Sequence, residues 1–239
     1  MNVIKSLAKS MGYELVKRHQ NPSIMFHLMD LTKLNEIDLV LDVGANTGQF
    51  ASEIMKAGYT GEVHSFEPVK NTFKELDLAA SGNSNWHVHN FAMGETQGES
   101  EINVSNASNF SSMLNTSDYG KERYKKSAVE YTEIIQINTI DSFLKENITN
   151  LKERRILLKT DTQGFDLQVI AGAQESMSSV HCLLCEISLI PIYEGMPNYL
   201  DSLKAFESHG FIATGFYPIS RNRANLALIE MDCVMIKGS

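Results

Sequence analysis

An apolar segment that runs directly into a turn with two glycines constrains this chain most. Residues 40–50 read V-L-D-V-G-A-N-T-G-Q-F, and residues 62–68 read E-V-H-S-F-E-P. Each segment predicts a buried strand, and glycine at the turn permits a sharp bend and a close approach of the backbone to a ligand. Glu67 follows Gly48 by 19 residues, near the ~20-residue spacing at which an acid reaches ribose hydroxyls. The pattern therefore predicts a nucleoside pocket.

The same turn indicates which nucleoside binds. A dinucleotide fold carries G-x-G-x-x-G, whose glycines make room for a pyrophosphate. Here Asp42 precedes Gly44, and three bulkier residues separate Gly44 from Gly48. A carboxylate at position 42 repels a pyrophosphate and favours a cation, so S-adenosylmethionine, with its sulfonium and amino groups, is the predicted cofactor. The alternative is a strand-ending turn that binds no ligand.

Composition limits the partners and the number of domains. The 239 residues are 43% hydrophobic, which suits one α/β domain (residues 36–239) behind a helical N-terminal extension (residues 1–35). The net charge of −8 argues against a nucleic-acid partner, because affinity for phosphates depends on clustered Lys and Arg. We expect no membrane span, since no apolar window reaches ~18 residues. Three cysteines do not suggest a disulfide framework, and we expect a cytoplasmic protein.

Strand and helix patterns alternate along most of the chain. We expect strands at residues 39–43, 62–66, 86–91, 156–161, 180–188, 211–216 and 226–236, and helices at 49–57, 69–80, 165–177 and 197–209. This alternation predicts a Rossmann-like α/β fold, a parallel sheet with helices on both faces, closed by an antiparallel C-terminal hairpin. Apolar residues at helical spacing also predict one or two helices before residue 35, outside the main fold. That N-terminal segment is mildly basic, through Lys5, Lys9, Lys17 and Arg18.

The alternation of strands and helices is interrupted by a polar segment at residues 94–131, which is rich in Ser, Asn, Gly and Glu. Strands at 99–104 and 131–138 are expected to pair as an antiparallel excursion. Long irregular segments inside compact domains are usually functional or mobile. We interpret this one as a wall of the substrate site or a lid, with a disordered surface loop as the alternative.

Neither the cysteines nor the histidines predict a metal site. Cys182 and Cys185 form a C-x-x-C within an apolar strand, where residues three apart face opposite sides of the sheet. The histidines lack a ligand spacing such as i,i+4 on one helix. Asp161 has no adjacent Asp or Asn. We therefore expect no metal.

Three blocks resemble the FkbM-type methyltransferases: L-D-V-G-A-N-T-G at residues 41–48, S-F-E-P at 65–68, and L-K-T-D-T-Q-G-F-D at 158–166. Segments at 170–173, 191–195 and 232–234 fit as well. The third block is the most specific, although Asp166 stands where the family commonly has Glu. The resemblance implies a class I methyltransferase sheet and S-adenosylmethionine-dependent O-methylation of a sugar or glycan hydroxyl, or of a secondary metabolite.

Site residues follow from the strand ends and from the resemblance. Asp161 is the candidate catalytic base. The equally weighted alternative is that it holds the turn at Gln163 or contacts the amino group of the cofactor. We assign Asp42, Gly44, Asn46 and Gly48 to the methionine end of the cofactor and Glu67 to its ribose. The remaining cofactor candidates are Asn90, Phe91, Ala92 and Ser112, and the substrate candidates are Glu186, Tyr193 and Glu194.

Two other functions stay open from the sequence. A nicotinamide-dependent oxidoreductase uses a similar sheet, but it normally carries G-x-G-x-x-G and ends on a parallel strand. A methyltransferase-like binding module without catalysis is the other alternative. The acceptor is expected to be a small molecule or a glycan, and the oligomeric state is open.

Overall fold

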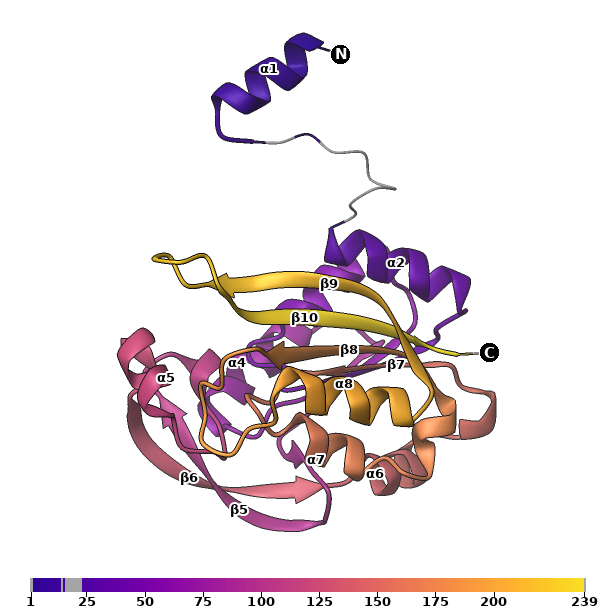
Figure 1. The fold of residues 1–239 in the computed structure, drawn as a ribbon. Helices are drawn as coiled ribbons and strands as arrows, with labels where there is room; N and C mark the ends of the chain where they lie inside the picture. The colour runs from indigo at the N-terminus through magenta and orange to yellow at the C-terminus, as the bar shows by residue number, and fades with distance from the viewer. Residues whose placement is uncertain (1, 14, 16–22, 239) are drawn as a thin grey trace.

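The computed structural model describes residues 2–13, 15 and 23–238. Lys17 and Arg18 of the basic N-terminal segment lie outside these residues. The described part of the chain contains a seven-stranded sheet with the strand order β3-β2-β1-β7-β8-β10-β9 (Figure 1). Its strands are β1 (Leu39–Val43), β2 (Glu62–Phe66), β3 (Trp86–His89), β7 (Ile156–Thr160), β8 (Val180–Ser188), β9 (Phe211–Arg221) and β10 (Leu228–Lys237).

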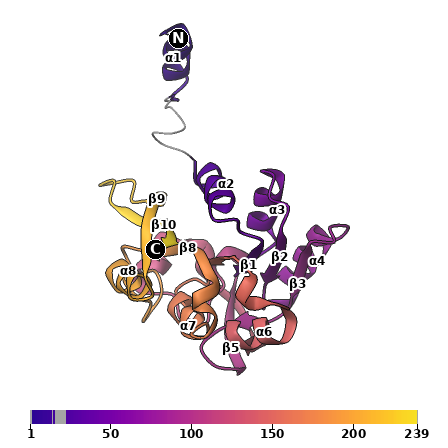
Figure 2. The ribbon, with the colours of Figure 1, turned by 90° about the vertical axis from the view of Figure 1, so that its right-hand side faces the viewer.

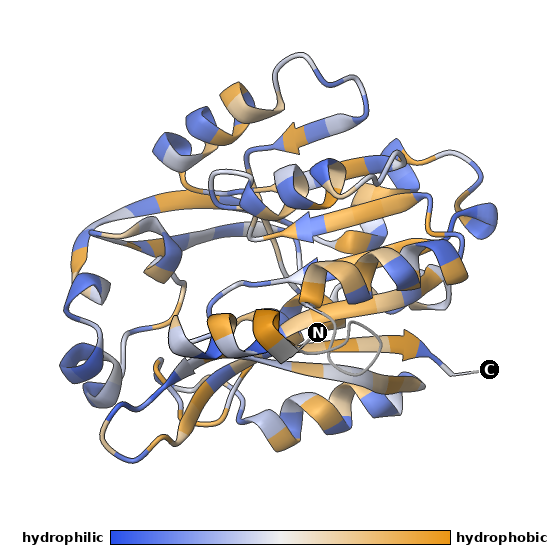
Figure 3. Ribbon diagram, turned by 90° about the horizontal axis from the view of Figure 1, so that it is seen from above, coloured by the Kyte–Doolittle hydropathy of each residue, from blue (hydrophilic) through white to orange (hydrophobic). Residues whose placement is uncertain are grey.

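The direction of the strands confirms the predicted fold class. Strands β3, β2, β1, β7 and β8 are parallel, whereas β10 runs antiparallel to both β8 and β9. The apolar residues of the central strands form a hydrophobic layer through the molecule (Figure 3). Since the carboxyl ends of parallel strands meet at one edge, polar residues that follow β1, β2 and β7 are brought together there.

Helices cover both faces of the sheet (Figure 2). Helices α2 (Ile24–Leu34), α3 (Gln49–Lys56) and α4 (Lys70–Ala80) contribute to one core. Helices α6 (Ile140–Asn147), α7 (Asp166–Ala171) and α8 (Tyr199–Ser208) contribute to the other. As predicted, Cys182 and Cys185 lie on opposite sides: Cys182 belongs to the first core and Cys185 to the second.

One of the two N-terminal helices differs from the expectation of helices outside the main fold. Helix α1 (Asn2–Ser10) stands apart from the sheet in both ribbon views (Figures 1 and 2). Helix α2 instead packs on the sheet, because Leu28, Met29 and Leu31 are buried in the first core. No helix among the described residues is long and apolar enough to cross a membrane.

The polar segment that interrupts the alternation is a small folded sheet. As predicted, β5 (Gly98–Ser105) and β6 (Val129–Asn138) pair antiparallel, and β4 (Ala92–Met93) joins β6 on its other side. Ile102, Val104 and Ile135 give this sheet a core of its own. Short helices lie between β5 and β6, at η1 (Ser108–Phe110), α5 (Asp118–Arg123) and η2 (Lys125–Ser127). The disordered-loop alternative is therefore wrong.

Several element ends were predicted wrongly. Strand β3 ends at His89, and α7 ends before Gly172, where a Cβ would lie 2.0 Å from the carbonyl oxygen of Gly94. Strand β9 continues through Pro218, which an edge strand tolerates. Helix α6 was not expected; its N-cap Thr139 accepts a hydrogen bond from the Ser142 amide. The 3₁₀ helices η3 (Leu151–Glu153) and η4 (Ser176–Ser179) flank β7 and β8.

Candidate functional site

The turn after β1 packs tightly against the neighbouring strand β7. Gly44 has φ +72°, and a Cβ there would lie 2.0 Å from the carbonyl oxygen of Asp161. Gly48, with φ +87°, caps α3, and a Cβ there would lie 2.8 Å from the Trp86 ring. Both positions therefore require glycine for packing within the protein. Gly44 also lines the pocket described below, whereas Gly48 lies behind it.

A buried ion pair holds this turn from beneath. Lys159 Nζ lies 3.0 Å from Asp42 Oδ1 and donates to the Gly44 carbonyl oxygen at 2.8 Å. The Ser65 hydroxyl donates to Asp42 Oδ2 at 3.0 Å. Burial lowers the pKa of Lys159, but Asp42 and Asp161 outweigh it, and the net pKa is raised. Asp42 is fully buried, so it braces the turn from below the pocket.

An open pocket of about 840 Å³, counting the space at its mouth, lies at the carboxyl ends of β1, β2 and β7. The carboxylates of Glu67, Asp161 and Glu186 are on its wall, and among the described residues lining it there is no Lys, Arg or His. The sequence-predicted residues that it brings together are Gly44, Asn46, Glu67, Ala92, Ser112, Asp161 and Glu186.

Glu67 is positioned by backbone donors at the end of β2. Its carboxylate accepts hydrogen bonds from the Asn46 amide at 3.0 Å and from the Val69 amide at 2.9 Å. Burial raises the pKa of Glu67 to about 7, against these amide donors, which favour the charged form. Each carboxylate oxygen accepts two hydrogen bonds, so the side chain retains acceptor capacity for a diol.

Part of the pocket lining is apolar, and we call this part the apolar slot. Phe66, Met93 and Ile102 line it together with Ala92, a surface suited to a flat heteroaromatic ring. Asn90 and Phe91, which we also assigned to adenine, are not on the lining. Asn90 donates to the carbonyl oxygens of Glu67 and Pro68 at 2.9 and 3.0 Å. Phe91 packs against Phe66, with ring centroids 5.6 Å apart.

The small sheet supplies a wall of the same pocket. Ser108, Ser111 and Ser112, in the segment after β5, line it. The Ser108 hydroxyl donates to Asn46 Oδ1 at 3.0 Å, and the Ser112 hydroxyl donates to the Gln163 carbonyl oxygen at 2.8 Å. This segment therefore spans from the β1 turn to the β7 turn.

Asp161 lies where this pocket meets a second hollow. Both hollows are lined by Gly44, Asn46, Asn109 and Asp161, and the second continues to α2, Phe50 and Asp232. The Asp161 side chain is 38% exposed, and its Oδ2 lies 3.9 Å from Lys159 Nζ. Gln163 Nε2 donates to Asp161 Oδ1 at 2.9 Å, so both suggested roles of this residue, base and turn brace, have a geometric basis.

Two further acids face each other beside Asp161. Glu186 on β8 and Asp232 on β10 are partners in the antiparallel register. Burial, together with the nearby Asp161 charge, raises the pKa of Asp232 to about 7, and Lys159 opposes the shift. The same causes raise the pKa of Glu186 well above its usual range. Apart from its place in a motif, Asp232 could not be recognised as a site residue, because only the strand register brings it to Glu186.

The two remaining substrate candidates lie off the pocket walls. Tyr193 is buried, with its hydroxyl 2.9 Å from Gln163 Oε1 and 3.1 Å from the Phe110 carbonyl oxygen. It connects the serine-rich wall to the Gln163 turn. Glu194 is exposed and lines neither hollow.

Comparisons with known proteins give a family but no near relative. Similar solved structures include magnesium protoporphyrin IX methyltransferase from Synechocystis (10% identity; 99% of this chain and 96% of that chain; TM-score 0.47). TehB from Haemophilus influenzae is 10% identical over 92% of this chain and 65% of that chain, with TM-score 0.47. The fibrillarin pre-rRNA processing protein of Methanococcus jannaschii is 11% identical over 84% of this chain and 66% of that chain, with TM-score 0.44.

No curated protein sequence matches the chain. A model of the methyltransferase FkbM domain matches residues 42–213, from the Asp42 turn through most of the sheet. That match covers well over half of the chain and confirms the resemblance, and with it S-adenosylmethionine as the cofactor. The chain belongs to the FkbM methyltransferase family.

Proposed function

We propose that the protein is a cytoplasmic O-methyltransferase that transfers the methyl group of S-adenosylmethionine to a hydroxyl of a sugar, glycan or secondary metabolite. One observation carries the proposal. The pocket presents three carboxyl groups and, among its described lining residues, no cationic side chain, and it shares Asp161 with a second hollow.

The charge of the pocket fits the cofactor. The sulfonium and ammonium groups of S-adenosylmethionine are cationic, and carboxylates within a few ångströms favour a cation. Glu67 would accept hydrogen bonds from the ribose, the slot of Phe66 and Met93 would take the adenine, and the Gly44 turn with Asp161 would hold the methionine end. A nicotinamide dinucleotide would place its pyrophosphate against the same acids, which argues against the oxidoreductase alternative.

The residues at the junction suit methyl transfer to oxygen. S-Adenosylmethionine supplies an activated methyl group: the hydroxyl oxygen forms a C–O bond to it as the C–S bond breaks and a neutral thioether leaves. The protein's part is to hold the hydroxyl in line and to accept its proton. Asp161 is partly exposed at the junction of the two hollows, where a base would contact the acceptor.

The second hollow suits a hydroxylated acceptor. Gln49, Asn109 and Asp232 offer hydrogen-bonding groups on its lining, and Phe50 offers an aromatic face. Sugars bind through this combination of polar groups and aromatic surface. The acids at the junction would repel a phosphate backbone, so we favour a small molecule or glycan over a nucleic acid.

The experiment measures binding and turnover separately. Wild-type protein is incubated with methyl-labelled S-adenosylmethionine and pools of glycans, lipids and small hydroxylated metabolites. Asp161→Asn retains an Oδ1 that accepts from Gln163 but cannot accept a proton. At saturating cofactor, methyl transfer should therefore fall by about 100-fold or more. Glu194→Gln, exposed and off the pocket walls, is the matched control.

The outcomes separate the alternatives. Full activity in Asp161→Asn would leave that residue only its bracing role. Cofactor binding without transfer to any pool would indicate a non-catalytic binding module. Binding of a nicotinamide dinucleotide in place of S-adenosylmethionine would indicate the oxidoreductase.

A further inference from the structure

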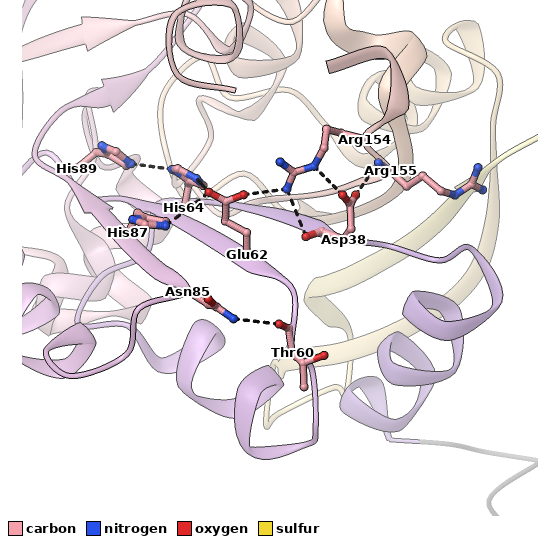
Figure 4. A network of polar contacts seen from close by, with 9 residues as sticks. All are labelled: Asp38, Thr60, Glu62, His64, Asn85, His87, His89, Arg154 and Arg155. Atoms are coloured by element: carbon pink, nitrogen blue, oxygen red, sulfur yellow. Dashed lines mark hydrogen bonds and ion pairs between the residues drawn. The ribbon is translucent and has the colours of Figure 1, made fainter. Parts of the chain in front are cut away.

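Side chains from two neighbouring strands, β2 and β3, gather in one cluster (Figure 4), and the pocket lining includes none of Glu62, His64 and His87. The parallel register places His64 of β2 opposite His87 of β3. His64 Nε2 lies 2.9 Å from Glu62 Oε1, and His87 Nε2 lies 3.5 Å from the same oxygen. One ligand atom from each of these three residues lies within 4.8 Å of the others. Two imidazole nitrogens and a carboxylate oxygen therefore lie close together, within the reach of one ion.

We propose that Glu62, His64 and His87 bind a borderline divalent transition-metal ion of the Zn²⁺ class, at a site separate from the methyl-transfer pocket. Zn²⁺ takes His nitrogen and carboxylate oxygen at about 2.0–2.2 Å. Tetrahedral ligands at that distance lie about 3.4 Å apart, close to the observed 3.5 Å between His87 Nε2 and Glu62 Oε1. The 2.9 Å contact of His64 must open by roughly half an ångström, and the two histidine nitrogens, which lie within 4.8 Å of each other, must adopt the same spacing of about 3.4 Å.

Neighbouring groups orient the ligands, as they do around metal ions generally. His64 Nδ1 lies 2.9 Å from His89 Nε2, which fixes the His64 ring. Arg154 donates to Glu62 Oε2 at 2.9 Å, so Oε1 is turned to the histidines. Arg154 Nε in turn lies 2.6 Å from Asp38 Oδ2. Asp38, Glu62 and Arg154 together carry one net negative charge, which favours a cation.

Metal binding at this site needs no net loss of protons. Without metal, the hydrogen-bond chain is satisfied when His64 Nε2–H donates to Glu62 and His89 Nε2–H donates to His64 Nδ1. A bound ion takes the place of the proton on His64 Nε2. That proton moves to His64 Nδ1, which then donates to His89 Nε2. The proton of His89 moves in turn from its Nε2 to its Nδ1.

The position of the site indicates a structural role. Glu62 begins β2, and Glu67 of the cofactor pocket comes five residues later, about 16 Å along an extended strand. Strand β3 is at the edge of the sheet, so the ion would clamp this edge strand to β2. The His87 side chain is 45% exposed, which leaves a further coordination position open to water.

The test uses tag-free, chelator-treated, full-length protein. Zn²⁺ is titrated in competition with a chromophoric chelator, and Co²⁺ is added separately to record its visible d–d absorption. We expect one ion per chain and a tetrahedral Co²⁺ spectrum. Affinity should fall about tenfold or more in His87→Ala and in Glu62→Gln, but not in His209→Ala, which removes a histidine outside the cluster. Zn²⁺ at a hundredfold excess over its dissociation constant should raise the wild-type Tm by about 5–10 °C.

Two results would overturn the proposal. If the cluster is only a hydrogen-bond chain, wild-type protein will show no stoichiometric binding at micromolar Zn²⁺. Equal Zn²⁺ affinity in wild type and His87→Ala would place any bound ion elsewhere. Because His87 is half-exposed, its replacement is expected to leave the metal-free unfolding curve unchanged, which excludes a trivial loss of fold.

Discussion

Replacing Lys159 by methionine tests whether a buried charge pair holds the turn after β1. Lys159 Nζ lies 3.0 Å from Asp42 Oδ1, and the two side chains are 9% and 0% exposed. Methionine matches the lysine side chain out to Cε but removes the ammonium group, and with it the charge and the bond to the Gly44 carbonyl oxygen. Asp42 would then be a buried carboxylate with the Ser65 hydroxyl as its remaining donor.

Removing one partner of a buried ion pair costs about 3–5 kcal/mol, and we expect Lys159→Met to lose this much free energy of unfolding. Asp42→Asn removes the stranded charge while keeping an oxygen for Ser65. The double variant should therefore be more stable than the sum of the single losses by about 2–3 kcal/mol. Urea unfolding followed by circular dichroism measures all three variants. Lys145→Met, at an exposed position on α6, should stay within about 0.5 kcal/mol of wild type.

Strictly additive losses in the double variant would refute this reasoning, because they would show no coupling between Asp42 and Lys159. A loss below about 1 kcal/mol for Lys159→Met would do the same, since an exposed pair is worth no more than that.

Three further outcomes follow from the pocket. Gly44→Ala places a Cβ 2.0 Å from the Asp161 carbonyl oxygen at φ +72°, and thermal unfolding should show a loss of about 2–4 kcal/mol. Since burial raises the pKa of Glu67 to about 7 and its charged form is the better acceptor, calorimetry should show cofactor affinity falling as pH drops below 7, with a flat profile in Glu67→Gln. Asp232→Asn removes a charge that raises the pKa of Glu186, so the titration of Glu186, followed by carboxyl-group NMR, should move to lower pH.

The pocket was predictable where local sequence determines position. Residues 40–50 read as a strand, turn and helix because an apolar segment meets two glycines, and the structure places β1, the turn and α3 there. Glu67 reaches the pocket because it follows the neighbouring parallel strand. The same logic placed Asp161 after β7. Most of the pocket residues that we predicted correctly therefore lie directly after a predicted strand.

What the sequence concealed depends on contacts between distant segments. Strand β1 is buried on both faces, so no alternation shows that Asp42 points away from the pocket and towards Lys159. Asp232 reaches Glu186 only through the antiparallel register of β10 and β8. The histidine cluster depends likewise on the β2–β3 register, and helical spacing rules cannot detect ligands on adjacent strands.

Calorimetric titration of the protein with S-adenosylmethionine, beside a nicotinamide dinucleotide, measures directly what the acidic pocket binds. We predict one site per chain for S-adenosylmethionine, with affinity reduced about tenfold or more by Glu67→Ala, and no heat of binding for the dinucleotide. Binding of the dinucleotide, no binding of S-adenosylmethionine, or equal affinity in wild type and Glu67→Ala would contradict this assignment of the pocket.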